Sequence, residues 1–331
     1  MTASSRQSKK KKMETLRRIA EEIRAGQRFL ISTHVNPEGD AIGSALALSL
    51  ALQGLGKEVE VLNQDPTPEV LAFLPGAEGI IHRAPENQRF DVAFALDCGD
   101  EERLGEEFAK VKEIGKVISI DHHVSNHYFG DLNFVDPSAS SAAEILYDLL
   151  RLIPVKITPA LAENIYVGIL TDTGSFHYSN TSPKTFTVAR ACLLAGVDPW
   201  KVAEKVYETQ PLPRLRLLPL VLGTLEVMEE GRVSSMVVAQ WMMEETGASA
   251  ALTEDFVNFP RSLKGVEVAL LFRELSPEKY RVSLRSRGSV DVARISEEFQ
   301  GGGHPNAAGC TVEGRLPEAK ARVLQRVRAA L

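Results

Sequence analysis

Ile118-Ser119-Ile120-Asp121-His122-His123 is the stretch that decides the fold, because a short apolar, β-branched run ends there in an acid and two adjacent imidazoles. Such a run is typical of a buried strand in a parallel sheet, and open α/β sheets bind ligands beyond the carboxyl ends of their strands. Two other apolar runs end in the same way, one at His34 and one at Asp97. A fourth acid, Asp172, follows an apolar helical run. The shared position of these residues predicts a functional site.

Length and composition set limits on the class of protein. The 331 residues suggest two domains, and 44% hydrophobic with 25% charged residues is ordinary for a soluble protein. The basic N-terminus has no apolar segment after it, so no secretory signal is expected, and no apolar run approaches the roughly 20 residues of a membrane span. The three cysteines form no disulfide framework, which favours the cytoplasm. A net charge of −6 and a pI near 5.8 argue against binding of long nucleic acid.

The order of elements predicts an α/β fold. Residues 1–12 are expected to be a disordered basic tail. Asp40 is interpreted as the N-cap of a buried helix, unless it serves the site. In the first domain, 13–198, we expect helices at 13–25, 41–55, 101–112, 140–152, 158–171 and 183–195, with strands at 28–33, 58–62, 90–96 and 116–120.

The alternation of strands and helices stops after residue 198. A helical linker is expected at 199–216 and a smaller mixed α/β domain at 217–331. In this domain we expect strands at 233–240, 266–275, 280–285 and around 310–312, with helices at 290–299 and 316–331. The predicted architecture is a mostly parallel sheet with helices on both faces, then the smaller domain, with the active site in the cleft between them.

Six residues are candidate metal ligands. They are two imidazoles and four carboxylates: His34, Glu38, Asp40, Asp97, His122 and Asp172. Such a set suits Mn²⁺ or Mg²⁺ better than structural zinc, which prefers thiolates. Six ligands exceed the need of one ion, so two cations with Asp97 as the bridge are expected. A single histidine at a strand end is more often structural, but four such segments favour the metal interpretation.

The paired imidazoles raise a geometric question. On an ideal strand, side chains alternate, so His122 and His123 cannot both point the same way. One is therefore expected on the metal and the other toward the substrate. Asp121 is left with a supporting role, capping the chain or orienting an imidazole.

These motifs resemble those of the DHH phosphoesterase family. The matching residues are His34-Val-Asn-Pro-Glu38-Gly-Asp40, Asp97, Asp121-His122-His123 and Asp172-Thr-Gly-Ser-Phe176, and Gly301-Gly-Gly-His304-Pro-Asn-Ala-Ala308-Gly309 resembles the signature of the family's associated C-terminal domain. Together they cover nearly the whole chain. The length resembles that of the members that degrade short oligoribonucleotides (nanoRNases) and dephosphorylate 3′-phosphoadenosine 5′-phosphate (pAp).

The resemblance implies roles for individual residues. It assigns His34, Glu38 and Asp97 to one Mn²⁺, and Asp40, Asp97, His122 and Asp172 to the other. His123 would face the scissile phosphate, so His123 and Asp97 are the catalytic candidates. The family usually has Asp where this chain has Glu38, which bears on metal preference.

Substrate contacts are expected from the second domain. The run of glycines lets backbone N–H groups approach an anion closely. Gly302, Gly303, His304 and Arg285 are the candidates, with Arg273 and Arg287 as weaker ones. Cys98 and Cys310 are interpreted as packing residues. The expected partners are short RNA and pAp, with a homodimer as a further option.

Two other functions stay open at this point. The chain could be a related hydrolase of linear or cyclic dinucleotides or, less favoured, of pyrophosphate. It could also be a nucleotide-binding regulator with an impaired metal site. Only Glu38 favours the regulator, and the other five ligands stand against it.

Overall fold

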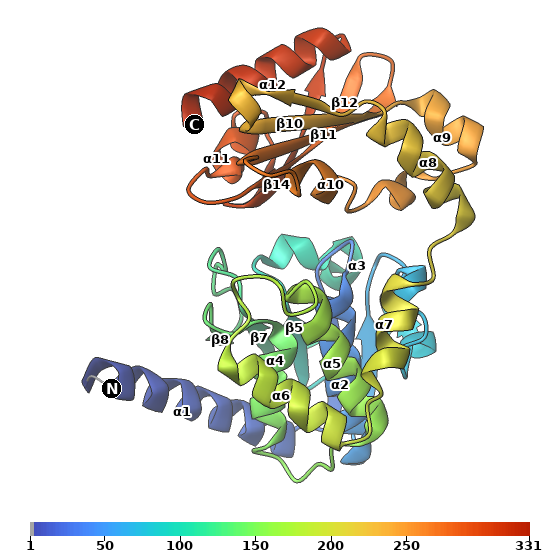
Figure 1. The fold of residues 1–331 in the computed structure, drawn as a ribbon. Coiled ribbons are helices and arrows are strands. Elements are labelled where there is room, and N and C mark those ends of the chain that lie inside the picture. Colours follow the sequence, from blue (N-terminus) through green and yellow to red (C-terminus); the bar gives the residue numbers. More distant parts are fainter. Residues whose placement is uncertain (1–2) are drawn as a thin grey trace. The chain divides into compact units, whose positions relative to one another are not determined.

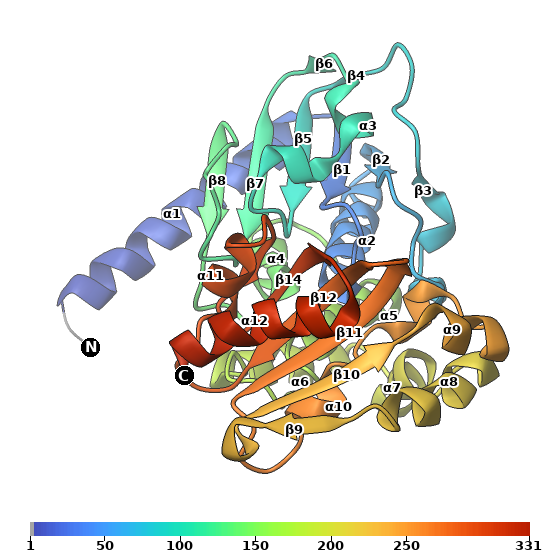
Figure 2. The same ribbon diagram turned by 90° about the horizontal axis from the view of Figure 1, so that it is seen from above.

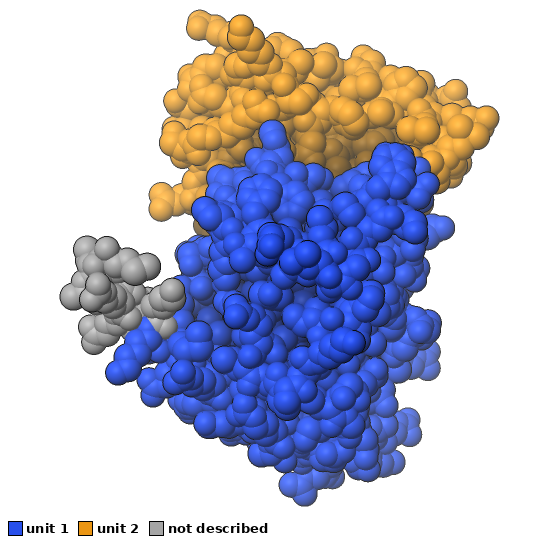
Figure 3. All heavy atoms as spheres, turned by 60° about the horizontal axis from the view of Figure 1, so that its bottom comes forward, with its two compact units in different colours: residues 1–209 blue, residues 210–331 orange. Residues whose placement is uncertain are grey.

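The chain folds into two compact units, each of the α/β class (Figure 1). The computed structural model describes residues 3–331, apart from the side chains of residues 3–9 and of His304. Unit 1 ends at Thr209 and unit 2 begins at Gln210, and Figure 3 colours them separately. Within the described chain, no helix combines the length and the apolar character that crossing a bilayer requires. The predicted fold class is confirmed.

Unit 1 is built on a sheet of six parallel strands in the order β3-β2-β1-β5-β7-β8. The strands are β1 (Arg28–Thr33), β2 (Glu58–Leu62), β3 (Ile80–Ile81), β5 (Val92–Leu96), β7 (Val117–Asp121) and β8 (Leu132–Val135). The order reverses between β1 and β5, which is where open α/β sheets bind ligands. The register aligns the ends of β1, β5 and β7, so His34, Asp97 and Asp121 leave the sheet in one row.

Most helices of unit 1 belong to one core. They are α1 (Ala3–Ala25), α2 (Gly39–Gly54), α4 (Ala142–Leu150), α5 (Pro159–Asp172), α6 (Pro183–Leu194) and α7 (Pro199–Tyr207). Phe29 and Ile31 of β1 face this core, whereas Leu30 faces a smaller core on the other side of the sheet. The short η3 (Glu101–Leu104) and α3 (Glu106–Ala109) cover that second side. Side chains of a strand alternate between the two faces of the sheet. Both faces are buried here, which explains why the strands are apolar at every position.

Smaller elements complete unit 1. They are the 3-10 helices η1 (Glu69–Leu71) and η2 (Ala77–Gly79), and a two-stranded parallel ribbon of β4 (Arg89–Phe90) and β6 (Glu113–Ile114).

Helices α2 and α5 approach each other closely because glycines line their contact. A Cβ at Gly43 would lie 2.5 Å from the backbone oxygen of Asn164 in α5. A Cβ at Gly168 would lie 2.7 Å from Asp40 Oδ1. Neither position has room for a methyl group. The close approach lets Asp40, at the start of α2, reach the end of α5, where Asp172 lies.

Unit 2 contains a mixed sheet in the order β13-β14-β12-β11-β10-β9. The strands are β9 (Glu226–Met228), β10 (Val233–Val238), β11 (Val268–Ser276), β12 (Lys279–Ser286), β13 (Gly302–His304) and β14 (Ala307–Glu313). Strands β10 and β11 are parallel, and the other pairs are antiparallel. On one face lie α11 (Val292–Glu297) and α12 (Leu316–Ala330), which Figure 2 shows over the sheet. The other face packs on α8 (Leu212–Leu222), α9 (Gln240–Thr246) and α10 (Asn258–Arg261), with η5 (Ala250–Thr253) beside them, whereas η4 (Glu229–Gly231) lies between β9 and β10.

Several expected elements differ from the structure. The helix expected at 101–112 is interrupted at Gly105, whose φ of 89° lies outside the helical range. Helix α1 begins at Ala3, so residues 3–12 are helical and not a disordered tail. This part of the chain has no proline or glycine to stop a helix. Residues 1–2 lie outside the described residues. Strands β3, β4, β6, β8, β9 and β13 and helices α9 and α10 were not expected.

The expected linker at 199–216 is divided between the two units. Val202 and Val206 of α7 are buried in the core of unit 1, whereas Leu217 and Val221 of α8 are buried in unit 2. The boundary therefore falls in the short segment between these two helices.

Replacing Gly43 with Ala is expected to lower the free energy of unfolding of unit 1 by about 2 kcal/mol, because overpacking against backbone forces the helices apart. Chemical denaturation of the full chain measures the change. Gly54→Ala is the matched control in the same helix, since its Cβ would have only an ordinary contact, 3.9 Å from Val155 Cγ2. That variant should be at least as stable as the unaltered protein, and equal effects of the two substitutions would contradict the prediction.

Candidate metal centre

The six predicted ligands lie together beyond the carboxyl end of the sheet in unit 1. They fall into two groups, His34–Glu38–Asp97 and Asp40–His122–Asp172, in each of which one ligand atom per residue lies within 4.8 Å of the others. His34 and Glu38 belong to the loop after β1, and Asp97 and His122 directly follow β5 and β7. The structure thus brings all six side chains together. Their role as ligands stays a prediction.

Asp97 links the two groups. Its Oδ2 lies 3.7 Å from His34 Nε2, and its Oδ1 lies 3.4 Å from His122 Nε2. The residue is 1% exposed and has a φ of 53°, an uncommon conformation for a non-glycine residue. Such backbone strain clusters at functional sites. The carboxylate is therefore placed between the groups, as a bridging ligand would be.

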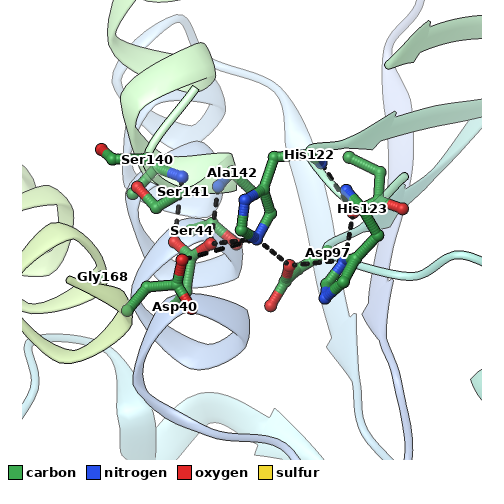
Figure 4. Close-up of polar contacts among 12 residues, drawn as sticks. Asp40, Ser44, Asp97, His122, His123, Ser140, Ser141, Ala142 and Gly168 are labelled. Atoms are coloured by element: carbon green, nitrogen blue, oxygen red, sulfur yellow. Dashed lines mark hydrogen bonds and ion pairs between the residues drawn. The ribbon is translucent and has the colours of Figure 1, made fainter. Parts of the chain in front are cut away.

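His122 is the centre of the second group. Its Nε2 lies 3.6 Å from Asp172 Oδ2 and 4.0 Å from Asp40 Oδ2. Figure 4 shows its ring between the side chains of Asp40 and Asp97. Among the described residues, neither His122 Nε2 nor Asp97 Oδ1 has a hydrogen-bond partner, although both atoms are buried. Buried polar atoms are nearly always paired, so this unpaired nitrogen and oxygen fit a cation-binding site.

The pKa values of the second group show an excess of negative charge. Burial, followed by the charge of Asp97, raises the pKa of Asp40 to about 8. Burial and the charge of Asp40 raise the pKa of Asp172 to about 8 as well. Burial opposes the charged form of His122, but the nearby negative charge of Asp97 outweighs it and raises the pKa to about 10. Burial would raise the pKa of Asp97, but the neighbouring imidazoles lower it. Divalent cations would offset this negative charge.

The interpretation of Asp40 as a helix N-cap is wrong. Helix α2 begins at Gly39, and its N-cap position is Glu38. The Asp40 carboxylate instead accepts hydrogen bonds from the backbone N–H groups of Ala142 (2.6 Å) and Ala143 (3.0 Å), about 100 residues away (Figure 4). These groups open α4, whose positive dipole end favours a carboxylate. Asp40 is therefore held by another helix.

Asp121 orients His123. Its Oδ1 accepts a 2.6 Å hydrogen bond from His123 Nδ1, and its Oδ2 accepts one of 2.8 Å from Asn126 Nδ2. Burial lowers the pKa of His123, but the bond to Asp121 outweighs it, so the pKa is raised. Strand β7 ends at Asp121, so alternation no longer applies to the two histidines. His123 Nδ1 also lies 3.5 Å from Asp97 Oδ1, contrary to the expectation that the imidazoles diverge.

Asn180 was not found by sequence reasoning. Its Nδ2 lies 3.1 Å from the carbonyl oxygen of Asp172, 3.3 Å from Asp172 Oδ2 and 2.9 Å from the carbonyl oxygen of Ser140. Asp172 is the last residue of α5, where the helix dipole disfavours a carboxylate. The amide donors of Asn180 offset this effect. Asn126 was missed as well. The only signal in the sequence is that Asn126 follows the Asp121-His122-His123 motif and Asn180 follows the motif that begins at Asp172.

The predicted substrate residues lie in unit 2. Arg285 belongs to β12, and Gly302, Gly303 and His304 form β13. The register pairs both Arg285 and His304 with Ala307 of β14, so these two positions lie in one row across three strands. The side chain of His304 lies outside the described part of the chain.

The cysteines have a packing role. All three are buried, and burial raises the pKa of Cys98 and of Cys192 to about 12. A thiol with such a pKa is a poor nucleophile or ligand near neutral pH.

Comparison with known families agrees with the motifs. Residues 28–169 match the DHH family, N-terminal domain, and residues 234–331 match the DHHA1 domain. The chain belongs to the DHH family of phosphoesterases. It is 37% identical to the bifunctional oligoribonuclease and PAP phosphatase NrnA of Thermus thermophilus, over 95% of this chain and 94% of that protein. It is 27% identical to the protein of the same name from Bacillus subtilis, over 86% and 89%.

Two solved structures share the fold. An exopolyphosphatase-related protein from Bacteroides fragilis superposes with a TM-score of 0.90 at 28% identity, covering 96% of each chain. RecJ of Thermus thermophilus in complex with Mn²⁺ has a TM-score of 0.56 at 15% identity, covering 95% of this chain and 55% of that one. The second likeness concerns the fold alone.

Mn²⁺ is expected to raise the melting temperature of this DHH protein, because binding to the folded state stabilises it, by about 2.7 kcal/mol at 100 times the dissociation constant. Asp97→Asn should abolish the shift, as measured by scanning calorimetry with and without EDTA. Asp91→Asn is the matched control at the other end of β5, where Asp91 accepts bonds from the N–H groups of Gln27 and Arg28. A full shift in the Asp97 variant would contradict the shared-ligand arrangement.

Asn180→Ala is expected to weaken Mn²⁺ binding by about 10-fold or more. The amide of Asn180 holds Asp172, a predicted metal ligand, and without this hydrogen bond Asp172 would be less well oriented. Calorimetric titration measures the affinity. Asn133→Ala is the control: Asn133 is also half-buried, and its amide bonds the backbone of Gly130 in a turn. Equal losses of affinity in both variants would show a general effect on the fold.

Proposed function

We propose that this DHH protein is a Mn²⁺-dependent hydrolase of short oligoribonucleotides and of pAp. The observation that carries the proposal is the pair of ligand groups that Asp97 links, as a member of the first group whose Oδ1 lies 3.4 Å from His122 Nε2 of the second. The substrate class is supported by similarity over nearly the whole chain to proteins named bifunctional oligoribonuclease and PAP phosphatase.

The donor set fits two hard divalent cations. In this proposal the first is held by His34, Glu38 and Asp97, and the second by Asp40, Asp97, His122 and Asp172. Carboxylates and imidazoles without a thiolate suit Mn²⁺, with Mg²⁺ as the alternative. When bound, two such cations lower the pKa of a water molecule and offset negative charge on phosphoryl oxygens.

The chain's own groups orient the site. His34 Nδ1 lies 2.8 Å from the carbonyl oxygen of Val35, and donation of its proton there would leave the Nε2 lone pair for a cation. Asp121 fixes the ring of His123 in the same way. We place His123 beside the scissile phosphate, where it would donate a hydrogen bond or proton to the phosphate or the leaving oxygen.

Unit 2 would supply the substrate contacts. A Cβ at Gly303 would lie 2.4 Å from the carbonyl oxygen of Ala307, and its φ is 146°, so packing and conformation both require glycine there. Gly302 is exposed and has no atom within 4 Å of a Cβ position, which leaves its backbone accessible to an anion. Arg285, in the row of His304, would contact a phosphate of the substrate.

A substrate panel tests the proposal. With Mn²⁺, the protein is expected to hydrolyse 5′-labelled di- to pentaribonucleotides and pAp, and to act more slowly as the oligonucleotide lengthens toward ten residues. Rates are measured by chromatographic separation of products. The same panel includes cyclic dinucleotides and pyrophosphate, which separate the related hydrolases.

Asp97→Asn is the negative control for contaminating nucleases and should show no turnover. If the unaltered protein binds Mn²⁺ but hydrolyses neither oligoribonucleotides nor pAp, the proposed function is wrong.

A further inference from the structure

One face of unit 2 is only partly covered. Along β12, Arg281, Ser283 and Arg285 are partly or fully exposed, whereas the alternating residues are buried against α11 and α12. Ala307 and Gly309 of β14 share the exposed face, because they pair with Arg285 and Ser283. The core formed with α8, α9 and α10 draws its strand residues from β10 and β11. The part of this face on β12 and β14 is therefore open.

Two arginines oppose each other where the covered and the open parts of this face meet. The register places Arg273 of β11 directly opposite Arg281 of β12. Like charges in such a cross-strand pair destabilise a sheet. Burial, followed by the charge of Arg281, lowers the pKa of Arg273, so the positive charge of Arg273 is disfavoured in this position.

Acidic side chains do not offset this pair. Among the described residues, no side-chain hydrogen bond or ion pair is found for Arg273 or Arg281, although the backbone of both is paired in the sheet. Glu313, which shares their face, is engaged by Lys279 at 3.3 Å. The guanidinium of Arg281 extends across β14, with Nη2 2.9 Å from where a Cβ of Gly309 would lie. The glycine thus gives the cation room to lie flat along the sheet.

We propose that Arg273 and Arg281 form a subsite for a second phosphate group of an oligonucleotide. The inference rests on the proposed function and adds to it a determinant of substrate length. An anion between the two guanidinium groups would convert a repulsive pair into two charge-assisted contacts, and arginine suits phosphate because its planar fork can donate two hydrogen bonds.

The spacing along β12 separates this subsite from Arg285. Four residues of a strand span about 13 Å, so a phosphate placed between Arg273 and Arg281 and a phosphate held at Arg285 would lie at separate points along the sheet. The two phosphates of pAp are carried by one ribose and are closer together than this. A chain of several nucleotides supplies phosphates farther apart. The arginine pair would therefore bind oligonucleotides and be idle with pAp.

Arg281→Gln tests the subsite. The KM for a pentaribonucleotide is expected to rise about 10-fold, as for loss of one charged hydrogen-bond donor, while kcat and KM for pAp stay within twofold. Affinity for a 5′-fluorescent pentaribonucleotide, measured by anisotropy in EDTA, should fall similarly and depend less steeply on salt. The melting temperature should stay equal or rise, because a like-charge contact is removed.

Lys264→Gln is the control, since it removes the same charge from an exposed position of unit 2 outside β11 and β12 and should leave both substrates unaffected. Equal effects of Arg281→Gln on pAp and pentaribonucleotide, or no effect on either, would overturn the subsite alone. If the unaltered protein hydrolyses neither substrate, the proposed function fails, and anisotropy still decides the subsite. In that case the subsite would be overturned if Arg281→Gln binds the pentaribonucleotide as tightly as the unaltered protein, or if the unaltered protein does not bind it.

Discussion

Concentration of buried carboxylates at one edge of a parallel sheet is the constraint on which unit 1 depends. Asp40, Asp97 and Asp121 are each almost fully buried, and a buried charge is costly unless it is paired. Each has a different compensation: two backbone N–H groups for Asp40, imidazoles for Asp97, and an imidazole with an amide for Asp121. These partners do not compensate all of the negative charge, and bound cations would neutralise the remainder.

The ends of two helices also act on the carboxylate charges, and their effects are opposite. Asp40 lies at the positive end of α4, whereas Asp172 lies at the negative end of α5 and needs the donors of Asn180. Both helices must pack tightly on α2 for the carboxylates to meet. Gly43 and Gly168 permit this approach, so residues without functional groups set the distance between functional ones.

Sequence patterns predicted the fold class and predicted that six side chains far apart in the sequence lie together, because buried parallel strands have continuous apolar runs and their ends coincide in space. They failed where a contact joins distant segments. The N–H groups that hold Asp40 come from α4, and local capping rules led to the wrong partner. Asn180 has no motif, and its role follows only from the turn after α5. The break at Gly105 depends on a positive φ that composition alone did not indicate.

The two units differ in the charge of their candidate functional residues, which are mainly carboxylates in unit 1 and arginines in unit 2. A site rich in carboxylates repels a phosphodiester until cations reverse its sign, and such cations treat all phosphate esters alike. Discrimination among substrates must therefore come from contacts away from the reacting phosphate, because only these differ between one nucleotide and several. In a chain of net charge −6, arginines without acidic partners on an open sheet face are where such contacts can form. In the proposed function, short oligonucleotides and pAp would then share one hydrolytic centre without sharing all of their binding contacts.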